Sequence, residues 1–150
     1  MSGIPFWPRL LGFAGLLPSL GCLAVLLFGP QDWHDAARMI ALGYALTILS
    51  FLGGTWWGIA ASAPAAERRQ ALAAVWIASM VPPLVAAGIV LAGIVWWPFV
   101  ETALVMTGAA IVLTLVADAR LGALAPRWWQ GLRIPLSLGL GTVTIASALI

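Results

Sequence analysis

The sequence predicts an all-α integral membrane protein, a single domain over residues 1–150 with five transmembrane helices. Hydrophobic residues make up 63% of the chain and charged residues only 8%, whereas soluble domains carry roughly 25% charged residues. Its uncharged runs come close to or exceed about 20 residues, the length that a helix needs to cross the hydrocarbon of a bilayer. The distribution of arginine between these runs predicts an N-terminus inside and a C-terminus outside.

The first two predicted helices cover residues 10–28 and 39–61. The first run carries no charge and ends at Gly29-Pro30, because proline lacks the N–H that continues a helix and its ring clashes with the preceding turn. The second run is also uncharged, and Pro64 limits its helix for the same reason.

The last three predicted helices cover residues 71–94, 99–117 and 134–150. The Trp-Trp-Pro sequence at residues 96–98 predicts a tight turn between the third and the fourth. The fourth carries only Glu101 and stops at Asp118. Residues 118–133 form the longest gap and are predicted to be an inner loop, after which the fifth helix runs to the C-terminus.

Six of the seven arginines lie in alternate gaps between the predicted helices, and only Arg38 falls in a gap of the other parity. The six are Arg9, Arg68, Arg69, Arg120, Arg127 and Arg133. Short loops rich in arginine stay on the cytoplasmic side of an inner membrane, which gives the predicted orientation. A basic interface of this kind favours membrane lipids and not nucleic acid. We expect the inner membrane of a bacterium, or the mitochondrial inner membrane if the protein is eukaryotic.

Small residues recur every four positions along the second predicted helix and so line one stripe. They are Ser50, Gly54, Gly58 and Ser62. Small side chains let helix backbones approach closely in lipid, where no hydrophobic force drives helices together. We expect the stripe to contact another helix of this chain, and the alternative is a partner protein or a second copy.

Pro82 and Pro83 fall near the middle of the third predicted helix. Each removes an N–H, so the carbonyls around Ala78 and Ser79 lose their partners. In hydrocarbon such groups must be satisfied by neighbouring side chains, water or a ligand. A simple kink accounts for the pair, and the alternative is a polar cavity or a translocation site at the break.

Most of the nine tryptophans lie at predicted segment ends, which is typical of an aromatic belt at the membrane interface. Trp56, Trp57 and Trp76 lie further inside, where packing between helices explains them. The alternative is a stacking platform for a flat ligand.

Asp118, Trp128 and Arg133 are predicted to form one unit at the inner interface. Asp118 ends the fourth predicted helix and Arg133 opens the fifth, so each charge lies beside the unfavourable end of a helix dipole. Antiparallel neighbours bring these two ends to the same face, where pairing would cancel both penalties.

Patterns of catalytic or metal-binding residues are missing from the sequence, which has no GxSxG, HExxH, CxxC or P-loop motif. The one cysteine, Cys22, lies inside the first predicted helix, and the one histidine, His34, lies in a loop beside two aspartates. No carboxylate lies deep in a predicted helix, as a proton-coupled carrier would require. The sequence therefore predicts no metal and no cofactor, and it disfavours an enzyme.

Four segments carry a family resemblance. The most specific, Y-A-L-T-I-L-S-F-L-G-G-T-W-W-G, spans Tyr44–Gly58, and the others are G-L-L-P at 15–18, W-I-A-S-M-V-P-P-L-V-A at 76–86 and D…P-R-W-W-x-x-L-R ending at Arg133. Together they resemble a small membrane-protein family of proteobacteria and mitochondria, whose eukaryotic members are named transmembrane protein sixty-nine. Relatives often carry His or Arg at the position of Trp56. The resemblance implies about five helices in an inner or mitochondrial membrane, with no established activity.

Two functions are compatible with these features. We expect a non-catalytic accessory subunit or assembly factor of a larger membrane complex, with a membrane-protein partner or a second copy bound through the small-residue stripe. The alternative is a small carrier or ligand-binding protein, with a pocket at the proline pair for a lipid or a flat apolar ligand such as a tetrapyrrole. The candidate binding residues are Tyr44, Ser50, Gly54, Trp57, Gly58, Pro82, Pro83, Asp118, Trp128 and Arg133.

Overall fold

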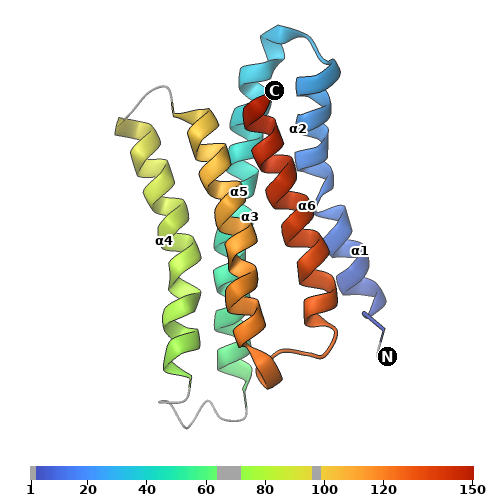
Figure 1. Ribbon diagram of the computed structural model, residues 1–150, viewed down its shortest axis with the longest axis vertical. Coiled ribbons are helices and arrows are strands. Elements are labelled where there is room, and N and C mark those ends of the chain that lie inside the picture. Colours follow the sequence, from blue (N-terminus) through green and yellow to red (C-terminus); the bar gives the residue numbers. More distant parts are fainter. Residues whose placement is uncertain (1–2, 64–71, 96–98) are drawn as a thin grey trace.

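The computed structural model describes residues 3–63, 72–95 and 99–150 as a bundle of helices (Figure 1). In these ranges there are no strands. The α helices are α1 (Phe6–Ala14), α2 (Leu17–Phe28), α3 (His34–Ser62), α4 (Ala73–Val95), α5 (Val100–Arg120) and α6 (Trp129–Leu149), with short 3-10 helices at Gln31–Trp33 and Gly122–Leu124. Counting α1 and α2 as one segment, five segments of the described chain are long and apolar enough to cross a membrane.

The first predicted helix, residues 10–28, is interrupted, and its prediction as one continuous helix was wrong. The chain leaves the helical pattern after Ala14 and resumes it at Leu17. Pro18 lacks the N–H that would bond to the carbonyl four residues earlier. In this break the Tyr44 hydroxyl of α3 donates a hydrogen bond to the Gly15 carbonyl oxygen at 2.5 Å. Tyr44 thus fixes the junction between α1 and α2 against the central helix.

The inner loop predicted for residues 118–133 was too long at both ends. Helix α5 continues through Asp118 to Arg120, and α6 already begins at Trp129. Only residues 121–128 connect the two helices. Charged residues were read as helix ends, but Asp118 and Arg133 bond to each other, so both remain inside helices. Helix α3 likewise begins at His34, ahead of the predicted residue 39, while the predicted start of the third helix at residue 71 lies outside the described residues.

Helix α3 lies at the centre of the bundle and contacts α2, α4, α5 and α6. The interior is built from the face of α3 that presents Ala45, Leu49 and Leu52 to Ile111 of α5 and Leu140 of α6. Helices α5 and α6 run antiparallel and approach closely at two glycines: a Cβ on Gly108 would lie 2.7 Å from the Gly141 carbonyl oxygen. The N-terminus and the α5–α6 connection lie at one end of the bundle, and the C-terminus lies at the other (Figure 1).

The two glycines of the small-residue stripe, Gly54 and Gly58, do not pack against another described helix, contrary to the expected intrachain contact. Gly54 and Gly58 are exposed, and a Cβ on either would have no neighbour within 4 Å. The residue that approaches α4 is Gly53, where a Cβ would overlap the Ser79 carbonyl oxygen and lie 2.7 Å from Cδ of Pro83. One residue turns a helix by about 100°, so the pattern was read one position out of register.

Helix α4 passes through Pro82 and Pro83 without ending, so the structure contains no break there. Pro83 deprives the Ser79 carbonyl of its usual N–H partner, and this oxygen faces Cα of Gly53. Only a hydrogen atom fits in the space between them. The Cα–H of Gly53 is thus placed as a weak hydrogen-bond donor beside the Ser79 carbonyl oxygen. Gly53 and Pro83 are therefore complementary features of the α3–α4 interface.

We predict that Gly53→Ala destabilises the protein by about 1–3 kcal/mol, because the added methyl forces two packed backbones apart. Gly54→Ala, in open space at the next position, should leave stability unchanged or raise it slightly, since alanine favours a helix over glycine. Unfolding of the purified protein in mixed detergent micelles measures both. Equal effects of the two substitutions would contradict the assigned face of α3.

Candidate functional site

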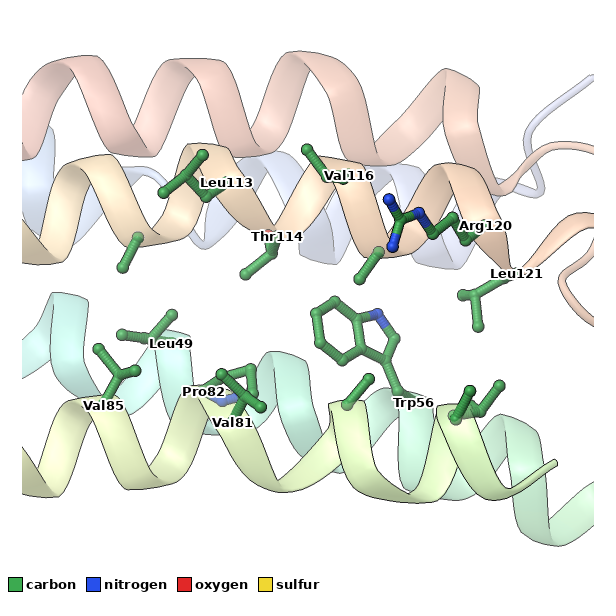
Figure 2. Close-up of a pocket in the computed structure, with 15 residues that line it drawn as sticks. Leu49, Trp56, Val81, Pro82, Val85, Leu113, Thr114, Val116, Arg120 and Leu121 are labelled. Atoms are coloured by element: carbon green, nitrogen blue, oxygen red, sulfur yellow. The ribbon is translucent and has the colours of Figure 1, made fainter.

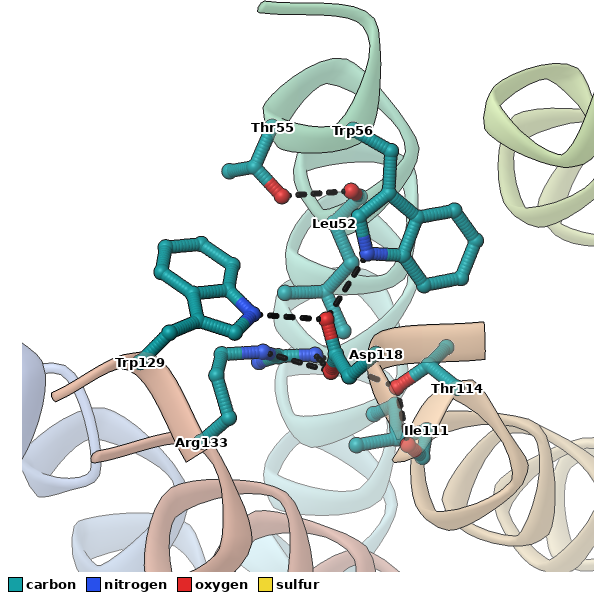
Figure 3. Close-up of polar contacts among 8 residues, drawn as sticks. All are labelled: Leu52, Thr55, Trp56, Ile111, Thr114, Asp118, Trp129 and Arg133. Atoms are coloured by element: carbon teal, nitrogen blue, oxygen red, sulfur yellow. Dashed lines mark hydrogen bonds and ion pairs between the residues drawn. The ribbon is translucent and has the colours of Figure 1, made fainter. Parts of the chain in front are cut away.

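A buried carboxylate joins three helices near the end of the bundle that holds the α5–α6 connection. Asp118, in the last turns of α5, has no exposed surface. Its Oδ1 accepts hydrogen bonds from Nε1 of Trp56 on α3 and Nε1 of Trp129 on α6, both at 2.9 Å (Figure 3). Its Oδ2 accepts a hydrogen bond from Nε of Arg133 on α6 at 2.9 Å, and Nη2 of Arg133 lies 2.9 Å from the same oxygen as an ion-pair contact. The carboxylate thus accepts three hydrogen bonds and pairs with one guanidinium.

Arg133 is also buried, with only 7% of its surface exposed. Its Nη2 also donates to Oγ1 of Thr114 at 3.2 Å, and Thr114 donates to the Ile111 carbonyl at 2.6 Å. The guanidinium carbon lies 5.9 Å from the centre of the Trp129 ring, within the range of a cation–π contact. A buried ion pair is tolerated when additional hydrogen bonds satisfy both charges, and this arrangement, the polar cluster, meets that condition.

The structure brings together two members of the predicted interfacial unit and replaces the third. Asp118 and Arg133 bond directly, but Trp129 and not Trp128 donates to the carboxylate. Helix α6 begins at Trp129, so only this indole has a helical position one turn before Arg133. Trp128 lies beside it, with ring centres 6.2 Å apart.

Sequence reasoning missed Trp56 and Thr114 as members of the polar cluster. Trp56 continues the buried face of α3 after Leu49 and Leu52, so its burial could have been read from the helical spacing. Thr114 lies one turn before Asp118 on α5 and could have been read the same way. The bond between Trp56 and Asp118 spans 62 residues, and no local pattern indicates it.

A groove between α3, α4 and α5 adjoins the polar cluster (Figure 2). Its volume is about 470 Å³, and nearly all of its lining is apolar. The indole of Trp56 and the ring of Pro82 line it together with Leu113, and Arg120 lies toward the end near Leu121. Ala78 of α4 also lines the groove. Trp56 therefore has two roles: its Nε1 is held by Asp118, and its ring forms part of the groove wall.

The other candidate residues lie elsewhere. Ser50, Gly54 and Gly58 are on the outer side of α3, and Tyr44 is bonded at the α1–α2 junction. Trp57 packs edge-to-face against Trp76 of α4, with ring centres 4.6 Å apart and an interplanar angle of 81°. The candidates therefore do not form one site: Asp118 and Arg133 belong to the polar cluster and Pro82 to the groove, while the others lie in separate places.

The polar cluster links α3, α5 and α6. Three hydrogen bonds converge on Asp118 from side chains of the protein, and the guanidinium of Arg133 pairs with its charge. Within the described ranges no three His, Cys, Asp or Glu side chains lie close enough to hold a metal ion. The groove, by contrast, offers an apolar volume with a cation at one end.

The comparisons with known proteins give one match. A family model described as "Protein of unknown function (DUF3429)" matches residues 4–149. No curated protein and no solved structure matches the chain. The segments quoted for the sequence resemblance all lie inside the matched range.

We predict strong energetic coupling between Asp118 and Arg133. Asp118→Asn or Arg133→Gln alone should destabilise the protein by about 3–5 kcal/mol, because each leaves a buried group without its charged partner. The double variant should lose less than the sum of the two by about 0.5–3 kcal/mol, measured by unfolding in mixed micelles.

The pair of Arg38 and Asp35, 3.5 Å apart, is the control, because the side chain of Asp35 is fully exposed although that of Arg38 is only 18% exposed. Asp35→Asn should cost much less than Asp118→Asn, because water screens the charge of the exposed aspartate. Additive losses at Asp118 and Arg133 would contradict the assigned contact.

Proposed function

The chain belongs to the family described as "Protein of unknown function (DUF3429)". We propose that it is a non-catalytic membrane protein that binds a lipid or a flat apolar ligand. The observation that carries this proposal is the groove between α3, α4 and α5. Its volume of about 470 Å³ lies within the range of roughly 300–1,000 Å³ that is usual for small-molecule pockets.

The walls of the groove suit such a ligand. Trp56 is only 2% exposed, and its bond to Asp118 fixes the plane of the indole. A fixed aromatic wall favours contact with a ring or an extended acyl chain. Arg120 is exposed and lines the same groove, so it is available to an anionic headgroup. The ligand class that fits best is therefore an anionic lipid.

We further propose that the protein spans the bacterial inner membrane, or the mitochondrial inner membrane in eukaryotes, with its N-terminus inside and its C-terminus outside. The five long apolar segments support the crossing. Arg9 of α1 and Arg127 of the α5–α6 connection belong to the end of the bundle opposite the C-terminus (Figure 1). Arg68 and Arg69 lie outside the described residues. The resemblance at Tyr44–Gly58 supports a place for transmembrane protein sixty-nine in the same family.

A second candidate function is that of an accessory subunit or assembly factor. The observation that favours it is the outer face of α3, where Gly54 and Gly58 have open space beside them. Another transmembrane helix, from a partner or a second copy, could approach this backbone closely.

The orientation predicts the behaviour of C-terminal fusions. In bacteria, alkaline phosphatase fused after Ile150 should be active, because the C-terminus would lie outside, and a fluorescent protein at the same position should be dark. A fluorescent C-terminal fusion together with an inactive phosphatase fusion would contradict this orientation and indicate that the C-terminus lies inside.

Mild-detergent purification followed by mass spectrometry tests the ligand. We expect the wild-type protein to retain an anionic lipid, and Ala78→Phe, which fills the groove, to reduce its amount severalfold. Ala87→Phe is the matched control, since Ala87 lies on the opposite, exposed side of α4. Arg120→Gln should lower the anionic share of the retained lipid.

Retention of no small molecule, or equal loss in the two phenylalanine variants, would contradict the binding function. A stoichiometric protein that co-purifies with the wild type and is lost in Gly58→Leu would favour the second candidate.

A further inference from the structure

A second cavity lies beneath the junction of α1 and α2, between α3 and α6. Its volume is about 340 Å³ and its lining is almost entirely apolar. It shares no lining residue with the groove between α3, α4 and α5. We call it the junction cavity, and its wall includes Gly15, Phe51, Trp129, Arg133 and Ser137.

The helix break provides the space for this cavity. Helix α1 ends at Ala14 and lies beside α6 rather than continuing the line of α2 (Figure 1). The Tyr44 hydroxyl holds the Gly15 carbonyl in that geometry. The cavity thus lies beside a helix junction whose geometry is held by a hydrogen bond.

Ser137 lines the junction cavity, and its buried hydroxyl has no partner among the described residues. Ser137 is 1% exposed, and its Oγ makes no hydrogen bond with any described residue. Other buried hydroxyls in α5 and α6 donate to a carbonyl three or four residues earlier; these are Thr107, Thr114, Thr144 and Ser147. The hydroxyl of Ser137, which lines the cavity, makes no such bond to a backbone carbonyl. A buried hydroxyl normally has a partner, so a bound acceptor would complete the site.

The charge balance around the junction cavity restricts the kind of acceptor. Arg133, one turn before Ser137, is already neutralised by Asp118. An anionic ligand would thus have no free cation to pair with among the described residues of an almost entirely apolar lining, which is unfavourable. A neutral carbonyl oxygen accepts a hydrogen bond without that penalty. The rings of Phe51, Trp128 and Trp129 in the wall favour a flat molecule.

We propose that the junction cavity binds a neutral, mostly apolar molecule through a carbonyl oxygen that accepts a hydrogen bond from Ser137, as a quinone head group would. The carbonyl of a lipid ester has the same chemistry. A volume of about 340 Å³ suits a substituted ring with part of its tail, and it is small for both chains of a phospholipid. The quinone is therefore the favoured source.

Binding is tested with two probes added to the purified protein in detergent. One is a short-tailed benzoquinone, decylubiquinone, and the other is phosphatidylethanolamine, whose esters supply the carbonyl. Binding of the quinone is measured by quenching of tryptophan fluorescence, because two indoles line the junction cavity. Binding of the lipid is measured by its ability to displace the quinone and restore the fluorescence. Ser137→Ala should raise the Kd for the quinone about fivefold, the effect of losing one hydrogen bond.

Ser147→Ala is the matched control, since Ser147 is also buried on α6 but donates to the Val143 carbonyl and does not line the cavity. It should leave the Kd unchanged. Ala78→Phe should also leave it unchanged, so a failure of the groove proposal is distinguishable from a failure here. Thermal unfolding of each variant verifies that it is folded.

The site is supported if either probe binds in a manner that depends on Ser137, and the responding probe identifies the source of the carbonyl. It is overturned if neither probe binds, or if Ser137→Ala and Ser147→Ala change the Kd equally.

Discussion

The arrangement of this bundle depends on one buried carboxylate. Asp118 of α5 is bonded by Trp56 of α3 and by Trp129 and Arg133 of α6, so a single residue fixes three helices relative to one another. In an apolar environment an unsatisfied charge is costly, and no other described group offers Asp118 an equivalent set of donors. The polar cluster thus specifies which faces of α3, α5 and α6 meet, a choice that apolar packing alone leaves open.

The same constraint explains how far the sequence predicts the fold. The number and order of the membrane-length segments follow from hydropathy, which depends on composition over many residues. The predicted helix boundaries were wrong where a charged residue lies inside a helix, as at Asp118 and Arg133. A local sequence pattern cannot reveal that a distant partner neutralises such a charge. Their mutual contact was predictable from the antiparallel neighbours, whereas the choice of Trp129 over Trp128 depends on where α6 begins.

The placement of the candidate site residues, like the helix boundaries, could be predicted only where local sequence patterns were sufficient. The stripe at Gly54 and Gly58 has the right spacing for helix packing, but spacing gives no information about which side of α3 faces inward. That side is set by Gly53, Leu52 and Trp56, which are buried. The groove beside Pro82 was foreseen only as an alternative, because a proline pair indicates unpaired carbonyls and does not say whether a neighbouring helix or a ligand accommodates them.

The contact between Gly53 and the Ser79 carbonyl has an evolutionary consequence. The oxygen lacks its helical partner because of Pro83, and it fits beside α3 because Gly53 has no side chain. A substitution at Gly53 is thus constrained by a proline 30 positions away, on a different helix. We therefore expect any relative that keeps this close approach of α3 and α4 to keep a residue without a side chain at the position of Gly53.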